Sequence, residues 1–269
     1  MKKTVLNYLV IAVFAVSAAF ASNNGNNIAK LPETITKSDG SYRKFEYDSQ
    51  NRITKILVYN DGKLYRTLAF TYSGNNLVKL ALNYPEYGIA ETEEYAKHEN
   101  QITITHVSDM GGGDGILDLS DDGYPTDYYG SDGHNLGFAY NYTIQNGNIT
   151  KVMTEQHRHG GGYKILKFSA HYTYDDKNSP FIHCTTPKWW MIIDMWDGMN
   201  SIGAEYGCKN NVIEENWSGI LNDVEENRSE DYTGKREYTY EYDNEGYPTK
   251  CTVKHIDGKV DVYTFKYVG

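Results

Sequence analysis

One strand–turn–strand phrase recurs along this chain, and it constrains the fold more than any other feature. Its clearest copy is residues 240–250, Tyr-Glu-Tyr-Asp-Asn-Glu-Gly-Tyr-Pro-Thr-Lys, which opens with aromatic and polar residues in alternation, the period of a half-buried strand. Asp243 to Gly246 then predicts a turn, because Asx side chains bond their own backbone and glycine adopts positive φ at little cost. Residues 45–55 repeat the phrase. The chain is therefore expected to be an array of β-hairpins.

Weaker copies of the phrase and separate turn signals extend this pattern over most of the chain. Asn60-Asp-Gly62 is a strong signal for a tight hairpin. The glycine-rich stretch 109–115 and residues 156–162 are expected to be loops. Strands are expected at 52–59, 64–72, 77–82, 91–95, 101–107, 116–119, 124–129, 138–144, 148–155, 163–174, 212–217, 236–242, 249–256 and 260–268.

One segment, about 186–200, breaks the hairpin pattern and predicts the only substantial helix. Thr186 suits the N-cap and Pro187 the first helical position. The helix itself is expected over Lys188 to Met199, apolar over most of its circumference and therefore largely buried.

The three tryptophans of this helix, Trp189, Trp190 and Trp196, are its candidate ligand-binding residues. Asp194 and Asp197 mark a polar stripe at helical spacing. At about 100° per residue, Trp196 and Trp189 lie far from that stripe, whereas Trp190 lies close to it. Trp190 is therefore expected to border solvent or a ligand.

Residues 1–21 have the pattern of a secretory signal peptide. Lys2 and Lys3 form a basic start, an apolar stretch follows, and Ala19-Phe20-Ala21 is a cleavage site that leaves Ser22 as the mature N-terminus. The alternative, an N-terminal membrane anchor, requires about 20 apolar residues, which this stretch does not reach. Residues 22–33 are expected to be a flexible tether, and 34–269 a single β-rich domain.

The charge balance excludes one class of partner. The formal net charge is −10 at pH 7. Nucleic acids and anionic membranes are bound by basic patches, so neither is expected as a partner. No stretch after the signal is long and apolar enough for a transmembrane helix, and a lipid or a glycan remains the expected ligand class.

Three cysteines, Cys184, Cys208 and Cys251, remain in the mature chain. An odd count leaves at least one thiol outside any intramolecular disulfide. Cys184 and Cys208 flank one segment and are candidates to pair; three unpaired buried thiols are the alternative reading.

Several acidic or histidine-rich stretches imitate catalytic or metal sites, but none completes one. Asp118, Ser120 and Asp122 resemble a calcium loop, although Tyr129 stands where a bidentate carboxylate is needed. His157 and His159 are expected to be a hairpin tip rather than a zinc or copper site. The carboxylates of 214–215 and 223–226 are expected to be solvated. We therefore expect no enzyme activity, cofactor or metal.

The phrase Tyr-x-Tyr-Asp-x-x-Gly-x-Pro/Ile-Thr-Lys resembles the tyrosine-aspartate repeats of Rhs-type proteins. From Thr34 to Gly269, the hairpins and the Asn178-Ser-Pro-Phe181 break before the aromatic helix resemble an uncharacterised family of secreted proteins from anaerobic gut bacteria. That resemblance implies a porin-like fold, an antiparallel sheet curled into an open or closed barrel. It implies no activity and no catalytic residues.

The fold expected is all-β, a large curved antiparallel sheet or barrel of about 12–15 strands with one aromatic helix packed against it. The leading functional hypothesis is a soluble, non-enzymatic binding protein of the periplasm or cell exterior. Its ligand, hydrophobic, amphipathic or a glycan, would lie between sheet and helix. The alternatives are a structural scaffold of the cell envelope, an outer-membrane barrel and, last, an enzyme.

Overall fold

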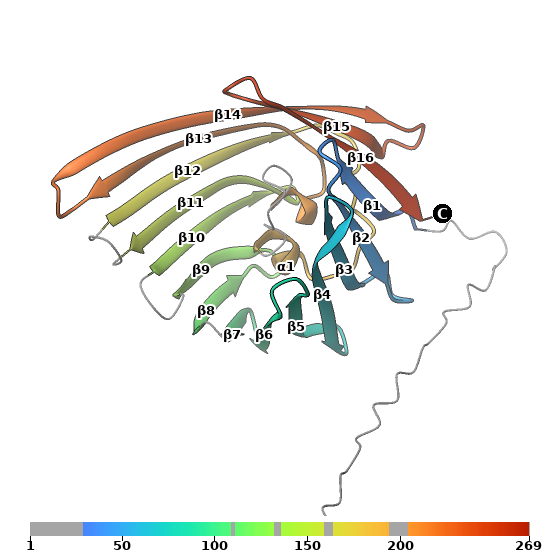
Figure 1. Cartoon of the computed structure of the whole chain (residues 1–269), viewed down its shortest axis with the longest axis horizontal. Helices are drawn as coiled ribbons and strands as arrows, with labels where there is room; N and C mark the ends of the chain where they lie inside the picture. Colours follow the sequence, from blue (N-terminus) through green and yellow to red (C-terminus); the bar gives the residue numbers. More distant parts are fainter. Residues whose placement is uncertain (1–28, 109–110, 132–135, 159–163, 194–203, 269) are drawn as a thin grey trace, which may run out of the picture.

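A computed structural model describes residues 29–108, 111–131, 136–158, 164–193 and 204–268 of the chain. Within these residues sixteen strands form one closed antiparallel barrel (Figure 1). Each strand pairs with its neighbours in sequence, and β1 closes the barrel on β16. The strands are β1 (Leu31–Lys37), β2 (Tyr42–Tyr47), β3 (Ile53–Asn60), β4 (Lys63–Ser73), β5 (Asn76–Tyr84), β6 (Ile89–His98), β7 (Gln101–Ser108), β8 (Gly111–Leu119), β9 (Pro125–Ser131), β10 (Leu136–Gln145), β11 (Asn148–Arg158), β12 (Lys164–Tyr174), β13 (Val212–Asp223), β14 (Arg228–Tyr242), β15 (Pro248–His255) and β16 (Val260–Val268).

The turns confirm the hairpin reading of the repeated phrase. Asp243 accepts hydrogen bonds from the backbone N–H of Glu245 (2.9 Å) and Tyr247 (3.0 Å). Asp48, at the same place in the earlier copy, accepts from Gln50 and Arg52 N–H at 2.9 and 3.0 Å. The two copies of the phrase therefore build the same carboxylate-capped turn.

The described residues correct several expected boundaries. β1 begins at Leu31, so the barrel starts inside the stretch expected to be a tether. Residues 111–115, four of them glycine, lie in β8 rather than in a loop, and residues 156–158 continue β11. β13 and β14 extend over residues 218–223 and 228–235, where no strand was expected because apolar alternation is weak there.

In the closed barrel, the side chains on the inner face of the wall are mainly apolar, whereas many of those on the outer face are polar or charged. Inward positions such as Ile56, Leu68 and Leu80 are buried and join one core. The outward positions between them include many threonines and charged residues, and exposed ion pairs link neighbouring strands across this face. These pairs are Glu46–Lys55 (3.6 Å), Lys79–Glu94 (3.5 Å), Glu155–Lys167 (3.2 Å), Glu214–Lys235 (2.7 Å) and Glu241–Lys250 (2.7 Å).

Glycines on the inward face of the long strands leave room for aromatic rings from the strand alongside. A Cβ on Gly234 would lie 2.0 Å from Cζ2 of Trp217, and one on Gly115 would lie 2.6 Å from Cε2 of Tyr128. Because each ring covers a neighbouring glycine, the strands stay paired where their own side chains are missing. This close approach explains why the glycine-rich stretch of β8 is part of the wall.

The segment 175–211, which joins β12 to β13, is here called the strap. It contains the helix α1 (Lys188–Ile193) and the 3-10 helix η1 (Ala204–Gly207). α1 lies inside the barrel (Figure 1), and its side chains share one core with β1 to β8. Residues 194–199 of the expected helix, including Trp196, Asp194 and Asp197, lie outside the described residues.

All three cysteines belong to the described part of the chain and are buried thiols. No disulfide joins Cys184 to Cys208, which decides between the two readings left open by the sequence. The expected signal peptide lies outside the described residues. Of the helices described, none has the length and apolar character needed to cross a bilayer.

Candidate functional site

The first half of the strap is fixed to the β2–β3 turn by hydrogen bonds. Thr185 N–H donates to the carbonyl of Asn51 at 3.1 Å, and its hydroxyl donates to the carbonyl of Gln50 at 2.5 Å. The buried Thr186 Oγ1 accepts from the N–H of Ile53 at 2.8 Å. The expected N-cap residue is thus bonded to the barrel wall two residues before the start of α1.

The second half of the strap is fixed to the β10–β11 turn. Asn148 Oδ1 accepts from the backbone N–H of Lys209 and Asn210, each at 3.0 Å. Ser179 Oγ donates to the carbonyl of Cys208 at 2.7 Å, which ties the two halves of the strap together. The strap is therefore held at both ends independently of any ligand.

A hollow of about 450 Å³ lies between the strap and the adjoining turns, and we call it the strap hollow. It is bounded by the strap residues 184–189, the β4–β5 turn, the ends of β6 and β7, and the β8–β9 turn. Its apolar lining is Leu77, Ile102, Leu119, Pro187 and Trp189. Its polar lining includes Asn75, Asn76, Lys97, Asp122, Thr185 and Lys188. The volume is within the range of about 300–1,000 Å³ that is usual for small-molecule sites.

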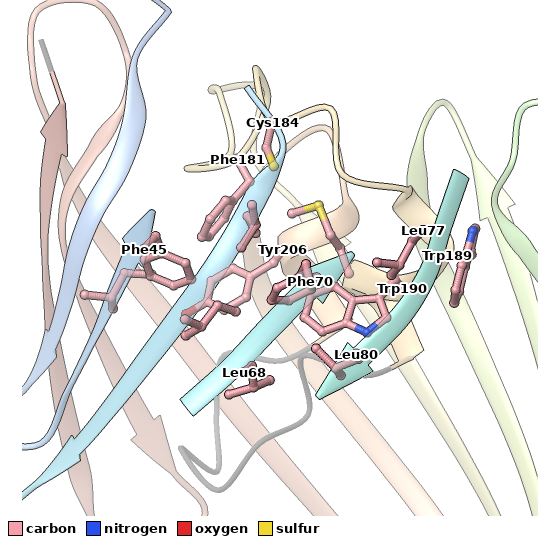
Figure 2. Close-up of a cluster of buried hydrophobic side chains, with 14 of the residues drawn as sticks. Phe45, Leu68, Phe70, Leu77, Leu80, Phe181, Cys184, Trp189, Trp190 and Tyr206 are labelled. Atoms are coloured by element: carbon pink, nitrogen blue, oxygen red, sulfur yellow. The ribbon is translucent and has the colours of Figure 1, made fainter. Parts of the chain in front are cut away.

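The structure places the two described candidate tryptophans differently. Trp189 lines the strap hollow and packs edge-on against Tyr95, with ring centroids 5.1 Å apart. Trp190 is 0% exposed and packs edge-on against Phe70 at 4.6 Å (Figure 2). The expectation that Trp190 borders solvent is wrong, because the barrel wall surrounds the helix and the side assumed to be open faces Phe70. Trp196 lies outside the described residues.

Lys188 is the polar residue of the strap hollow that sequence analysis missed. Its Nζ is buried and has no hydrogen-bond partner within the described chain. Burial lowers the pKa of this ammonium, and the nearby thiols of Cys184 and Cys208 oppose the shift. The only sequence signal was a lysine at the start of an otherwise apolar helix.

A second, shallower hollow of about 690 Å³ crosses strands β9 to β14. Most of its lining comes from two outward-facing ladder rows, one of which passes through Ala139, Glu155 and Lys167 and the other through Asn141, Met153 and Ser169. The exposed Tyr129, Met153 and Ile220 are its large apolar groups. Being on the outer wall, this groove lies apart from the strap hollow.

The other candidates from the sequence take structural roles. Asp118 accepts a hydrogen bond from Gln101 Nε2 at 2.9 Å, and Ser120 Oγ accepts from Tyr124 N–H at 3.2 Å, as expected for a repeat turn. His157 Nε2 lies 2.7 Å from Glu155 Oε1, while His159 is outside the described residues. Among the described residues no cluster of three metal-binding side chains occurs.

The adjacent carboxylates 214 and 215 point to opposite faces of β13. Glu214 forms an outward ion pair with Lys235 at 2.7 Å. Glu215 points inward and accepts from Arg236 Nη1 at 2.9 Å and from Tyr238 OH at 3.1 Å. Both carboxylates are thus engaged in ion pairs, and they do not face one another across a cleft.

No protein-family model matches the sequence, and comparison with curated proteins gives no match either. Among solved structures, the chain is similar to a porin-like protein from Bacteroides uniformis, with 14% identity and a TM-score of 0.39 over 88% of this chain and 96% of that one. A porin-like protein from Bacteroides vulgatus is similar at 13% identity and a TM-score of 0.39, over 89% and 99% of the two chains. At this TM-score, the similarity to these two structures carries no conclusion about the function of the chain.

Proposed function

We propose that this chain is an exported, water-soluble binding protein that holds a small amphipathic molecule in the strap hollow beside Trp189, without catalysing a reaction on it. The observation that carries the proposal is the strap hollow itself. It combines an apolar floor with amide, hydroxyl and amine groups at one end of a closed barrel. Apolar surface with a few placed polar groups is the usual composition of a small-molecule site.

The outer wall supports the water-soluble part of the proposal. A membrane barrel presents an apolar band about 25 Å tall to lipid, and charged residues on that face are costly. Here cross-strand pairs such as Glu155–Lys167 and Glu214–Lys235 occupy the outward face. On the inner face of the barrel, buried residues of β1 to β8 and of β13 to β16 join the core. This distribution of side chains suits a barrel surrounded by water.

The anchoring of the strap supports a hollow that exists before its ligand arrives. Thr185 and Thr186 are bonded to the β2–β3 turn, and the other half of the strap is bonded to Asn148. A site that is already formed loses little conformational entropy on binding. The competing structural role, in which the strap only fills the barrel, is favoured by the complete burial of Trp190 and Met191.

Titration calorimetry with decanol, a small uncharged amphiphile, separates the two roles. The wild type is expected to bind it with one site. Asn75→Trp, which places a large ring at the edge of the strap hollow, is expected to weaken binding at least tenfold. Lys63→Trp, at an exposed position at the opposite end of the barrel, is the control and is expected to bind as the wild type does. Binding unchanged in Asn75→Trp would place the ligand elsewhere, and no binding to the wild type would favour the structural role.

A further inference from the structure

Among the described polar groups that line the strap hollow, the amine of Lys188 is the buried one that makes no hydrogen bond to another described residue. An ammonium offers three donors and no acceptor. Nζ is buried, and within the described chain it donates to no acceptor. A buried donor without a partner loses its hydrogen bonds to water and gains none from the protein, which is unfavourable. An acceptor on a ligand would supply the missing hydrogen bond.

The charges around the strap hollow favour an anionic acceptor over a neutral one. Lys97 and Lys188 line the hollow, with Asp122 as a single acidic neighbour. Lys97 and Asp122 are exposed at the rim, so water screens both. The groups closest in influence to Lys188 are the thiols of Cys184 and Cys208, which are buried and supply no permanent negative charge. A carboxylate would supply both the acceptor and the opposite charge.

The apolar lining of the strap hollow indicates the chemistry of the part of the ligand that does not contact Lys188. Leu77, Ile102 and Leu119 form an apolar wall opposite the strap, and the Trp189 ring completes it. Resting on the proposed function, we propose that the ligand of the strap hollow is an apolar monocarboxylate, whose carboxylate pairs with Lys188 and whose hydrocarbon part packs against Trp189 and Leu77. The carboxylate defines the class, and the hydrocarbon part is limited by the volume of about 450 Å³.

Binding of such a ligand is coupled to a proton. In the empty hollow, burial lowers the pKa of Lys188, and a bound carboxylate raises it again. A ligand that raises a pKa is bound with proton uptake at pH values between the pKa of the empty site and the pKa of the occupied site. While the ligand carboxyl is ionised, affinity is therefore highest below the pKa of the empty site, and it falls as the pH rises from that pKa to the pKa of the occupied site. The other titratable groups facing Lys188 are Cys184 and Cys208, with Lys97 and Asp122 at the rim.

The test compares decanoate with decanol, which share a chain and differ in the head group. For the wild type, decanoate is expected to bind at least tenfold more tightly. Lys188→Met keeps an unbranched side chain as far as Cε and removes the amine. This variant is expected to lose the tenfold preference while binding decanol as before. Lys97→Met is the matched control and is expected to stay within threefold of the wild type for both compounds.

The outcomes separate this inference from the proposed function. Equal affinity of the wild type for decanoate and decanol, or a full decanoate preference in Lys188→Met, would overturn the carboxylate inference and leave the hollow as a site. Binding of neither compound would overturn both. Calorimetry of the wild type in two buffers of different ionisation enthalpy needs no variant. Repeated from about pH 7 to 10, it is expected to report proton uptake with decanoate over part of this range and none with decanol. The absence of uptake at every pH would count against the role of Lys188.

Discussion

At the scale of single residues, burial reverses the order that the sequence predicted for two tryptophans of α1, since Trp190, expected to be the more exposed, is the more buried. Trp190 is completely enclosed, and its ring touches Phe70 and belongs to the main core (Figure 2). Trp189 belongs to the same core but also forms part of the strap hollow. Stability therefore depends most on Trp190, whereas Trp189 is the residue placed to contact a ligand.

We expect Trp190→Ala to lower the free energy of unfolding by about 3–5 kcal/mol, because it removes a buried ring and leaves a cavity. Denaturant unfolding followed by circular dichroism measures the loss. Tyr87→Ala, at a position 60% exposed, is the control and is expected to cost less than about 0.5 kcal/mol. Equal losses in the two variants would contradict the placement of Trp190 in the core.

At the scale of elements, the position of the strap is fixed by hydrogen bonds to the barrel that its own sequence does not predict. Thr186 was expected to cap α1, yet its hydroxyl oxygen accepts from Ile53 N–H across the fold. Tyr72 OH donates to the carbonyl of the same Ile53 at 2.8 Å and closes this network. The network holds the start of α1 against the β2–β3 turn and so fixes one side of the strap hollow.

Replacing Thr186 by valine keeps the shape of the side chain and leaves the buried N–H of Ile53 without its acceptor. We expect a loss of about 1–3 kcal/mol in the free energy of unfolding. Thr185→Val, whose exposed hydroxyl donates to Gln50, is the paired control and is expected to lose about 0.5 kcal/mol or less. Thermal and denaturant unfolding measure both. A milder effect in Thr186→Val than in Thr185→Val would rule out the anchoring role.

The repeated turns give the fold a dependence on pH. Burial raises the pKa of Asp243, but the Lys30 ion pair and two backbone N–H groups outweigh burial and hold this pKa below its ordinary 3.8. Arg52 and backbone N–H groups do the same for Asp48. Because the folded-state pKa values are depressed, this stabilisation is present above pH 3.8 and is lost as the pH falls through the lowered values.

Thermal unfolding across the acidic range tests this dependence. The wild type is expected to lose stability steadily between about pH 5 and 2. A double variant, Asp48→Asn with Asp243→Asn, is expected to be less stable at pH 7 and to lose less on acidification. Parallel pH curves for the two proteins would show that other carboxyl groups are responsible.

Much of the hairpin order could be predicted from the sequence, because turn residues act locally. Asp61 and Gly62 have φ values of 49° and 74°, as a tight hairpin at Asn60-Asp-Gly62 requires. Closure of β1 on β16 could not be predicted, since it joins the two ends of the chain. The β8 glycines were misread because a ring on another strand, that of Tyr128, covers Gly115. Lys188 was missed because its burial is a property of the assembled barrel.

At the scale of the whole molecule, the closed barrel encloses its core and presents charge outward. At the end of the barrel away from the strap, Asp261 lies 2.9 Å from His255 Nε2 and 3.5 Å from Lys37 Nζ. His255 and Lys37 therefore both pair with Asp261. The buried apolar residues of the barrel pack around the described residues of the strap. The strap hollow thus lies at the border between core and solvent, where an amphipathic molecule fits best.

We expect the protein, expressed with its native N-terminus in a Gram-negative host, to be recovered outside the cytoplasm without detergent and to begin at Ser22. The physical reason is the signal pattern of residues 1–21 together with the charged outer wall. Cell fractionation and N-terminal sequencing check this. Recovery only from membranes in detergent, with Met1 intact, would contradict it.

The central claim, that the strap hollow binds a ligand, is tested most directly by native mass spectrometry of the protein recovered from its host. The account predicts a one-to-one complex with a small acidic molecule, lost from Asn75→Trp and retained by Lys63→Trp. A protein that carries no such mass and forms no complex after incubation with decanoate would contradict the account. An identical complex in Asn75→Trp would likewise contradict it, because the ligand would then lie outside the strap hollow.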